Sequence, residues 1–370
     1  MTVEAIPLVD LRSQHEQVAA DIAAGWGEVL QSCRFILGPK VDEFELAFAT
    51  AQGVAHCAAV ANGTDALELA ARAVGLRAGD AVLVPANTFA ATALAFMRMG
   101  LKPVLADCDP HHLLLDPAAV AARITPAVRA VVPVHLFGQM APMELIAEAA
   151  GPDVTLIEDA AQAQGARRRG QGAGSVGRVA ATSFYPGKNL GAYGDAGAVL
   201  TQSGAIARQV RALRNYGSEV KYHHPEAGFN SRLDELQAVV LSAKLKHLAH
   251  WNELRSRAAV NYDRLLADLG ERVQRPAVAP GNEHVWHLYV LRVANRDRVL
   301  ERLNAVGIGA AIHYPHPLHL LGAFAGLGYR RGDFPVAERA AGEILSLPLY
   351  PGISEAQQER VAAELKRALD

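Results

Sequence analysis

Cysteine, aromatic residues and long apolar runs are all scarce in this chain of 370 residues. Its three cysteines, Cys33, Cys57 and Cys108, cannot all pair and show no C-x-x-C spacing, which argues against a disulfide framework or a zinc ribbon. We therefore expect a reducing, cytoplasmic environment. No stretch reaches the ~18 apolar residues of a membrane span, and acidic and polar residues occupy the place of a signal-peptide core. We expect no membrane partner.

Charge of one sign is also lacking, because 36 basic side chains face 38 acidic ones. A balanced charge gives no positive field of the size that nucleic acid needs, and 51% hydrophobic residues argue against disorder. We expect small-molecule or protein partners and no nucleic acid. At roughly 100 to 200 residues per domain, the length allows two domains.

Short apolar runs alternate with helical patterns from Gly53 to about residue 200, which predicts an α/β fold with a mostly parallel sheet between helices. Helices are expected at 65–74, 90–99 and, as one long element, 234–269. A helix at 298–306, a strand ending near His313 and a final helix from Ser354 indicate a small α+β unit. We expect a large domain at 1–245 and a small domain at 246–370. The predicted strands are 55–60, 81–85, 103–107, 130–134, 154–158, 180–184 and 196–201.

Three segments carry candidate chemistry. Asn62, Gly63, Thr64 and Asp65 open a helix after a strand, which fits a phosphate seat but equally an ordinary helix N-cap. Asp159 ends a buried strand at the edge where α/β sheets bind ligands. A buried carboxylate needs a partner, which can be a protonated heterocyclic nitrogen or, equally well, a structural cation.

The third segment is SFYPGKNLG, in which a strand ends in a turn that presents Lys188 among small residues. Most lysines are exposed and inert, but one that apolar groups surround can have a lowered pKa and form a Schiff base. A phosphate seat, an acid for a ring nitrogen and a Schiff-base lysine are together what pyridoxal 5′-phosphate requires.

On these segments and others, among them NGTDAL, PANTFAAT, EDAAQAQGA, GFNSRLDELQA and HYPHPLH, the sequence resembles the DegT/DnrJ/StrS family of nucleotide-sugar aminotransferases. The matching segments span nearly the whole chain. The resemblance implies the pyridoxal-phosphate-dependent transferase fold of type I, with pyridoxamine 5′-phosphate as the intermediate form of the cofactor.

The resemblance also implies roles for individual residues. Lys188 forms the Schiff base and Asp159 binds the pyridine nitrogen, so these two are the catalytic residues. Gln162 contacts the ring hydroxyl, Phe89 stacks on the ring, and Ser183 binds the phosphate together with Gly63, Thr64 and Asp65. Asn230 reaches the phosphate from the neighbouring subunit, which implies a homodimer with shared sites. The implied substrate contacts are Tyr185, Tyr222, His313 and Tyr314.

The implied activity is transfer of the amino group of L-glutamate to a keto carbon of a dTDP-linked 6-deoxyhexose, with C3 favoured and 2-oxoglutarate released. Amination at C4 or of a cyclitol ketone is the alternative within this class. A dehydratase on the same fold would by resemblance carry histidine in place of Lys188, and a non-catalytic sensor would not need the intact lysine and acid.

Three other patterns predict no site, and we expect no metal. Gly172 to Gly177 fits G-x-G-x-x-G but leads into a strand, so it fails the dinucleotide pattern. His313, His316 and His319 lie among prolines that prevent a shared helical face. The run Arg167 to Arg169 is expected to be a solvated hairpin or loop. The sequence departs from the family pattern at Gln164, where histidine is common, and at Ala196, where glycine is common.

Overall fold

The computed structural model describes residues 5–370, and its largest element is a seven-stranded sheet in the order β1-β9-β8-β5-β4-β2-β3. Strand β9 is antiparallel to both of its neighbours, whereas the other neighbouring pairs are parallel. Each strand overlaps one of the seven predicted strands, and the predicted α/β class is confirmed. The bounds are β1 His56–Val60, β2 Ala81–Pro85, β3 Lys102–Ala106, β4 Val128–Val131, β5 Thr155–Asp159, β8 Val179–Ser183 and β9 Gly197–Thr201.

The parallel strands bring the predicted site segments to one edge of this sheet. Helix α3 (Gly63–Ala73) follows β1, and α4 (Ala90–Arg98) follows β2. Asp159 is the last residue of β5, and the turn that carries Lys188 follows β8. Because the carboxyl ends of parallel strands meet at the same edge, residues far apart in the sequence gather there.

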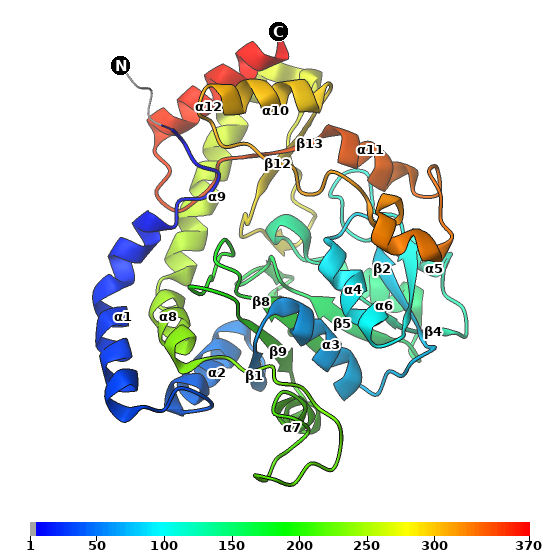
Figure 1. The fold of residues 1–370 in the computed structure, drawn as a ribbon. Coiled ribbons are helices and arrows are strands. Elements are labelled where there is room, and N and C mark those ends of the chain that lie inside the picture. Colours follow the sequence, from blue (N-terminus) through cyan, green and yellow to red (C-terminus); the bar gives the residue numbers. More distant parts are fainter. Residues whose placement is uncertain (1–4) are drawn as a thin grey trace.

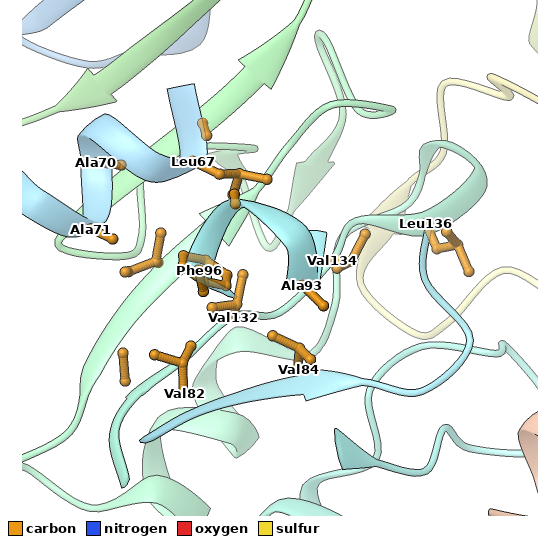
Figure 2. Close-up of a cluster of buried hydrophobic side chains, with 14 of the residues drawn as sticks. Leu67, Ala70, Ala71, Val82, Val84, Ala93, Phe96, Val132, Val134 and Leu136 are labelled. Carbon is orange, nitrogen blue, oxygen red and sulfur yellow. The ribbon is translucent and has the colours of Figure 1, made fainter. Parts of the chain in front are cut away.

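Apolar faces of α3 and α4 attach these helices to the sheet. Leu67, Ala70 and Ala71 of α3 and Ala93 and Phe96 of α4 belong to one buried cluster with valines of β2 and of the segment after β4 (Figure 2). Phe96 is fully buried, and burial of such a side chain stabilises a fold by about 1.5–3 kcal/mol. The packing fixes the helix N-termini against the strand ends.

Further helices surround the sheet (Figure 1). Glu235 caps one of them, because its carboxylate accepts hydrogen bonds from the backbone N–H groups of Gly38, Lys40 and Val41 at the start of α2. This fixes the N-terminal helices on α8. The bounds are α1 Arg12–Ser32, α2 Pro39–Gln52, α5 Pro117–Ala121, α6 Met143–Ala150, α7 Gly204–Leu213, α8 Glu235–Leu245, α9 Leu248–Leu265, α10 Arg296–Ala305, α11 Pro335–Glu343 and α12 Glu355–Leu369, with short 3-10 turns at Leu136–Gly138, Ala267–Arg272, Leu318–Leu320 and Gly322–Leu327.

The single helix predicted over 234–269 is wrong, since the chain forms two helices, α8 and α9, separated at Lys246 and His247. Helix α8 packs against α1 and α2, whereas α9 packs against α12. The helical sequence pattern continues through the junction, but the two halves bury their apolar faces against different neighbours. Packing against different neighbours therefore separates α8 from α9, although the sequence pattern is continuous.

The C-terminal part contains its own three-stranded sheet, β10 (Val273–Gln274), β12 (Tyr289–Val293) and β13 (Ile344–Leu347). In Figure 1, α9 runs from the region of the large sheet to α10 and α12 beside this second sheet. A strand ending near His313 is not formed, because Ala311 makes only an isolated bridge to Ser346. Ile6 joins the C-terminal core by pairing with Ile308. We keep the division at 245/246 as a proposal.

A third, short sheet joins β6 (Arg167–Arg168), β7 (Gln171–Gly172) and β11 (Asn282–Glu283). The arginine run is thus a hairpin, as expected, but Arg168 is buried and forms an ion pair with Glu144 at 2.5 Å.

Within residues 5–370, no helix has the length and apolar character that crossing a bilayer demands.

Candidate active site

The start of α3 lies against the end of β8. Asn62 caps the helix, since its Oδ1 accepts a hydrogen bond from Asp65 N–H at 2.8 Å. A Cβ atom at Gly63 would lie 2.6 Å from Ser183 Cβ, and one at Gly197 would lie 2.4 Å from the Asn62 backbone. Only glycine allows these approaches, which bring the Ser183 hydroxyl beside the positive end of a helix. Such an arrangement attracts phosphate.

Asp65 has other partners in the structure. Its carboxylate accepts a hydrogen bond from Ser231 Oγ at 2.9 Å and pairs with Arg98 at 3.2 Å. Since Asn62 takes the Asp65 N–H, the N–H groups of Gly63 and Thr64 are the ones at this helix start that the cap does not use. Asp65 therefore orders the seat, and the predicted direct contact of Asp65 stays a prediction.

Asp159 is 4% exposed at the end of β5. Its Oδ2 accepts a hydrogen bond from Thr92 Oγ1 at 2.8 Å, and its Oδ1 accepts one from Ala161 N–H at 3.2 Å. Burial raises the pKa of Asp159 above its ordinary value, although these hydrogen bonds oppose the shift. The raised pKa shows that the ionised carboxylate is poorly stabilised in this structure, so a cation bound beside it would stabilise it. Thr92, on α4, was not predicted from sequence, and only its spacing of four from Thr88 could have indicated a shared polar face.

The neighbouring acid, Glu158, is in a different state. Although burial alone would raise the pKa of Glu158, His135 at 2.7 Å and the N–H groups of Gly174 and Gly177 lower it below its ordinary value. The glycine-rich segment that resembles a dinucleotide motif therefore holds a carboxylate. The two consecutive acids differ because Glu158 contacts a histidine and three backbone N–H groups, whereas Asp159 accepts one hydroxyl and one N–H hydrogen bond.

Lys188 is partly buried in the turn after β8. Burial lowers the pKa of Lys188 to about 8, and the charge of Asp159 opposes this shift. Among residues 5–370, no hydrogen bond or ion pair of its ammonium group is found. A lowered pKa makes more of the neutral, nucleophilic amine available near neutral pH, and the lack of a fixed partner leaves that amine free to react.

Gln162, Phe89 and Tyr314 meet beside Asp159. Gln162 Oε1 accepts a hydrogen bond from Phe137 N–H at 2.6 Å, and its Nε2 donates to the Tyr314 hydroxyl at 3.0 Å. The rings of Phe89 and Tyr314 lie 5.1 Å apart. Burial and the nearby Asp159 raise the pKa of the Tyr314 hydroxyl, so it stays protonated.

His313 also belongs to this group. Burial lowers the pKa of His313 to about 4, with the charge of Lys188 adding to the shift, so the imidazole is neutral. Its Nδ1 lies 2.8 Å from Ser346 Oγ. His319 contacts Glu338 and His316 is exposed, so the three histidines face different surroundings. Within residues 5–370, no group of three metal-ligating side chains is found.

The remaining predicted residues are exposed. Tyr185 is 60% exposed, and its N–H donates to Ser183 Oγ at 3.3 Å. Asn230 is exposed next to Ser231. Tyr222 is 84% exposed in the segment between α7 and α8, which extends away from the sheet, and its ring contacts Lys221 (Figure 1). The structure does not bring Tyr222 to the group around Lys188 within one chain.

These side chains fit pyridoxal 5′-phosphate. The opening between Gly63 and Ser183 offers donors to a phosphate, Asp159 offers a carboxylate to a cationic ring nitrogen, and Lys188 offers an amine to an aldehyde. Phe89 has a half-exposed ring face available for stacking. The fold and this donor set are those expected of a pyridoxal-phosphate-dependent enzyme.

The comparisons with known proteins identify the family. The sequence model of the DegT/DnrJ/EryC1/StrS aminotransferase family matches residues 16–366, so the chain belongs to this family. The predicted family, fold and enzyme class are thereby confirmed.

Two curated relatives and one solved structure are similar over nearly their whole lengths. The erythromycin biosynthesis sensory transduction protein EryC1 of Saccharopolyspora erythraea is 46% identical, with 98% of this chain and 99% of the relative covered. The dTDP-3-amino-3,4,6-trideoxy-alpha-D-glucose transaminase of Streptomyces venezuelae is 44% identical, with 96% and 94% covered. The crystal structure of S. venezuelae DesV in complex with a ketimine intermediate has a TM-score of 0.96 and 43% identity, with 100% and 99% covered.

Proposed function

We propose that this aminotransferase uses pyridoxal 5′-phosphate to move the amino group of L-glutamate to C3 of a dTDP-linked 3-oxo-6-deoxyhexose. The observation that carries the proposal is that Lys188, whose pKa is lowered, and the buried Asp159, whose pKa is raised, lie at the same edge of the sheet, where each is affected by the other's charge. When bound, the cofactor supplies an electron sink for the carbon that loses a proton.

Each residue of the site has a part in this chemistry. Asp159, held by Thr92, keeps a negative charge where a ring nitrogen would be protonated. Gln162 presents its amide beside Tyr314, and Phe89 covers one side of the same space. Lys188 exchanges a proton through its amine, because a pKa of about 8 lets both of its forms coexist near neutral pH.

The substrate class rests on the relatives. Two that are 44% and 43% identical are named as dTDP-3-amino-3,4,6-trideoxy-alpha-D-glucose transaminases, and a third at 41% is named for dTDP-3-amino-3,6-dideoxy-alpha-D-galactopyranose. Other relatives are named for UDP-linked 3-keto sugars, which supports the C3 position more broadly than the nucleotide. Amination at C4 or of a cyclitol ketone is the alternative outcome.

We also propose a homodimer in which Asn230 acts in the partner's site. The exposure of Asn230 and of the aromatic rings of Tyr216 and Tyr222 supports this, because all three belong to the segment between α7 and α8 and a partner subunit could cover them. Mixing Lys188→Ala and Asn230→Ala subunits tests it. Shared sites predict recovery of activity in mixed dimers, whereas sites built from one chain predict none.

A regulatory role is a second candidate, since two relatives are named a sensory transduction protein and a pleiotropic regulatory protein. The intact pair of Lys188 and Asp159 favours catalysis. The test is separate incubation of the enzyme and L-glutamate with a dTDP-3-oxo-6-deoxyhexose and with a dTDP-4-oxo-6-deoxyhexose, with 2-oxoglutarate assayed and the product's amine located by NMR. An amine at C3 supports the proposal, an amine at C4 selects the alternative, and release of no 2-oxoglutarate with any ketosugar contradicts catalysis.

A further inference from the structure

A line of buried amide side chains joins the segment of Lys188 to the segment of Ser183. Asn189, the residue after Lys188, is 1% exposed, and its Nδ2 donates to Asn252 Oδ1 at 2.8 Å and to Val285 O at 2.9 Å. Asn252 Nδ2 donates in turn to Gln164 O at 3.0 Å. Gln164 Nε2 donates to Ser183 O at 2.8 Å. The line thus passes through α9 before it returns to β8.

The acceptors fix the direction of this line. Val285 O can only accept, so the Asn189 amide must turn its Nδ2 to it and its Oδ1 to the ring of His287, 3.2 Å from Nδ1. His287 therefore carries its proton on Nδ1. Burial lowers the pKa of His287 well below its ordinary value, in agreement with a neutral ring. Every polar atom of the Asn189 side chain has a partner.

Two glycines give the line its space. A Cβ atom at Gly165 would lie 2.8 Å from Asn252 Nδ2, and one at Gly138 would lie 2.6 Å from the His287 backbone N. Both glycines have a positive φ, at which other residues are strained. The close approach of α9 to the segment at Gly165, and of the 284–287 segment to the turn at Gly138, thus depends on glycine in the backbone.

We propose that Asn189 and Asn252 are positioning residues that hold Lys188 at the site by tying its turn to α9 and to the segment before β12. Asn189 lies next to Lys188 and is fixed by three hydrogen bonds, while Lys188 itself has no fixed partner among the described residues. The amine is therefore placed by its neighbour. Because the same line ends at Ser183, one side chain of α9 sets the lysine and the expected phosphate seat together.

The importance of this inference rests on the proposed function, but its test does not require catalytic activity. Loss of the Asn189 hydrogen bonds frees the turn, and Lys188 then reaches water. Since burial lowers the pKa of Lys188 to about 8, release shifts that pKa toward its ordinary value of 10.5. A merely structural role elsewhere in the fold would leave the amine's titration unchanged.

The experiment measures the pKa of Lys188 in the cofactor-free, full-length protein. Brief acetylation with acetic anhydride at a series of pH values, followed by peptide mass spectrometry, gives the midpoint for Lys188, with the exposed Lys246 as internal reference. Asn189→Ala is expected to raise the midpoint by about one unit or more. Asn252→Ala is expected to raise it in the same direction by less, because Asn189 keeps Val285 O.

Asn261→Ala is the matched control, since Asn261 lies on the same helix and donates to Gln358 Oε1 at 3.0 Å. It should leave the midpoint unchanged. An unchanged midpoint in a folded Asn189→Ala protein overturns the inference. If that variant does not fold, the Asn252→Ala variant is the test, because Asn252 lies in α9 and alanine is well tolerated in a helix. If the midpoint shifts but no glutamate reaction is found, the inference stands and the proposed function fails.

Discussion

Lys188 and Lys244 have similarly lowered pKa values, but their ammonium groups have different surroundings. Burial lowers the pKa of each to about 8. Lys244 donates to Gly191 O at 2.7 Å, and its ammonium lies 4.5 Å from the ring of Tyr193. Lys188 has neither kind of contact among residues 5–370, but it senses the charge of Asp159. A lowered pKa alone therefore does not identify a nucleophile.

The difference lies in what each amine is free to do. The hydrogen bond to a carbonyl and the contact with an aromatic ring both fix the Lys244 ammonium in place. Lys188 sits at the edge of the sheet where Asp159, Gln162 and Ser183 converge, and only its backbone is fixed by the turn. The site is therefore defined by the elements that bring these residues together, and the lowered pKa of Lys188 is a consequence of that arrangement.

Replacing each lysine in turn is expected to give the largest difference between the two. Lys188→Ala is expected to lower the rate of transamination by about 10⁴-fold, because the amine both attaches the cofactor and moves the proton. Lys244→Met, which keeps the side-chain bulk, is expected to retain activity within about tenfold. Steady-state release of 2-oxoglutarate from glutamate measures both. Equal losses in two folded variants would contradict the assignment of Lys188.

Changing Asp159 tests the difference between the two lysines further, because within residues 5–370 no carboxylate is found beside Lys244. Asp159→Asn is expected to lower kcat by about 10²–10³-fold, because a neutral amide stabilises a cationic ring nitrogen poorly. The cofactor-free variant should melt at a higher temperature than the wild type at pH 8. The reason is that the raised pKa of Asp159 makes the folded state bind protons more tightly, so its contribution to stability is lost as pH rises.

Calorimetry at two pH values checks the stability part of this prediction. The difference in melting temperature should vanish as pH falls below the ordinary value of 3.8, where the carboxyl is protonated in both states. A wild type that melts above Asp159→Asn at pH 8 without cofactor would show that the carboxylate has a cationic partner already.

The smallest expected effect is the pH dependence of cofactor uptake. Only the neutral amine of Lys188 attacks an aldehyde, so the rate of uptake of pyridoxal phosphate should level off above about pH 8 and fall about tenfold per unit below it. Stopped-flow absorbance measures the rate. Lys244→Met should keep the same midpoint, and a midpoint near 10.5 would mean that the lysine turn is open in solution.

Much of the site could be predicted from the sequence because its chemistry lies in short segments. Strand, turn and helix start are local features, so NGTD, the acid at the end of β5 and the lysine after β8 could each be located, and the parallel sheet brings them to one edge. The family resemblance assigned Gln162 and Phe89 to the same place, where the structure has them beside Asp159 and Tyr314.

Contacts between distant segments were not predictable. Thr92 reaches Asp159 across 67 positions, and Asn252 reaches Asn189 across 63. The break between α8 and α9 carries no proline or glycine, and it follows from packing against different helices. The sequence pattern reports which face of a segment is apolar, but not which element will cover it.

By itself, the sequence determined the α/β class, the strands and the residue types that the chemistry needs, because periodicity and turn residues act over a few positions. Only the tertiary structure decided that Lys244 is held by a hydrogen bond to Gly191 O, and that Glu158 and not the adjacent Asp159 contacts His135 directly. Both depend on desolvation and on the donors that other elements supply, and these exist only once the elements have packed.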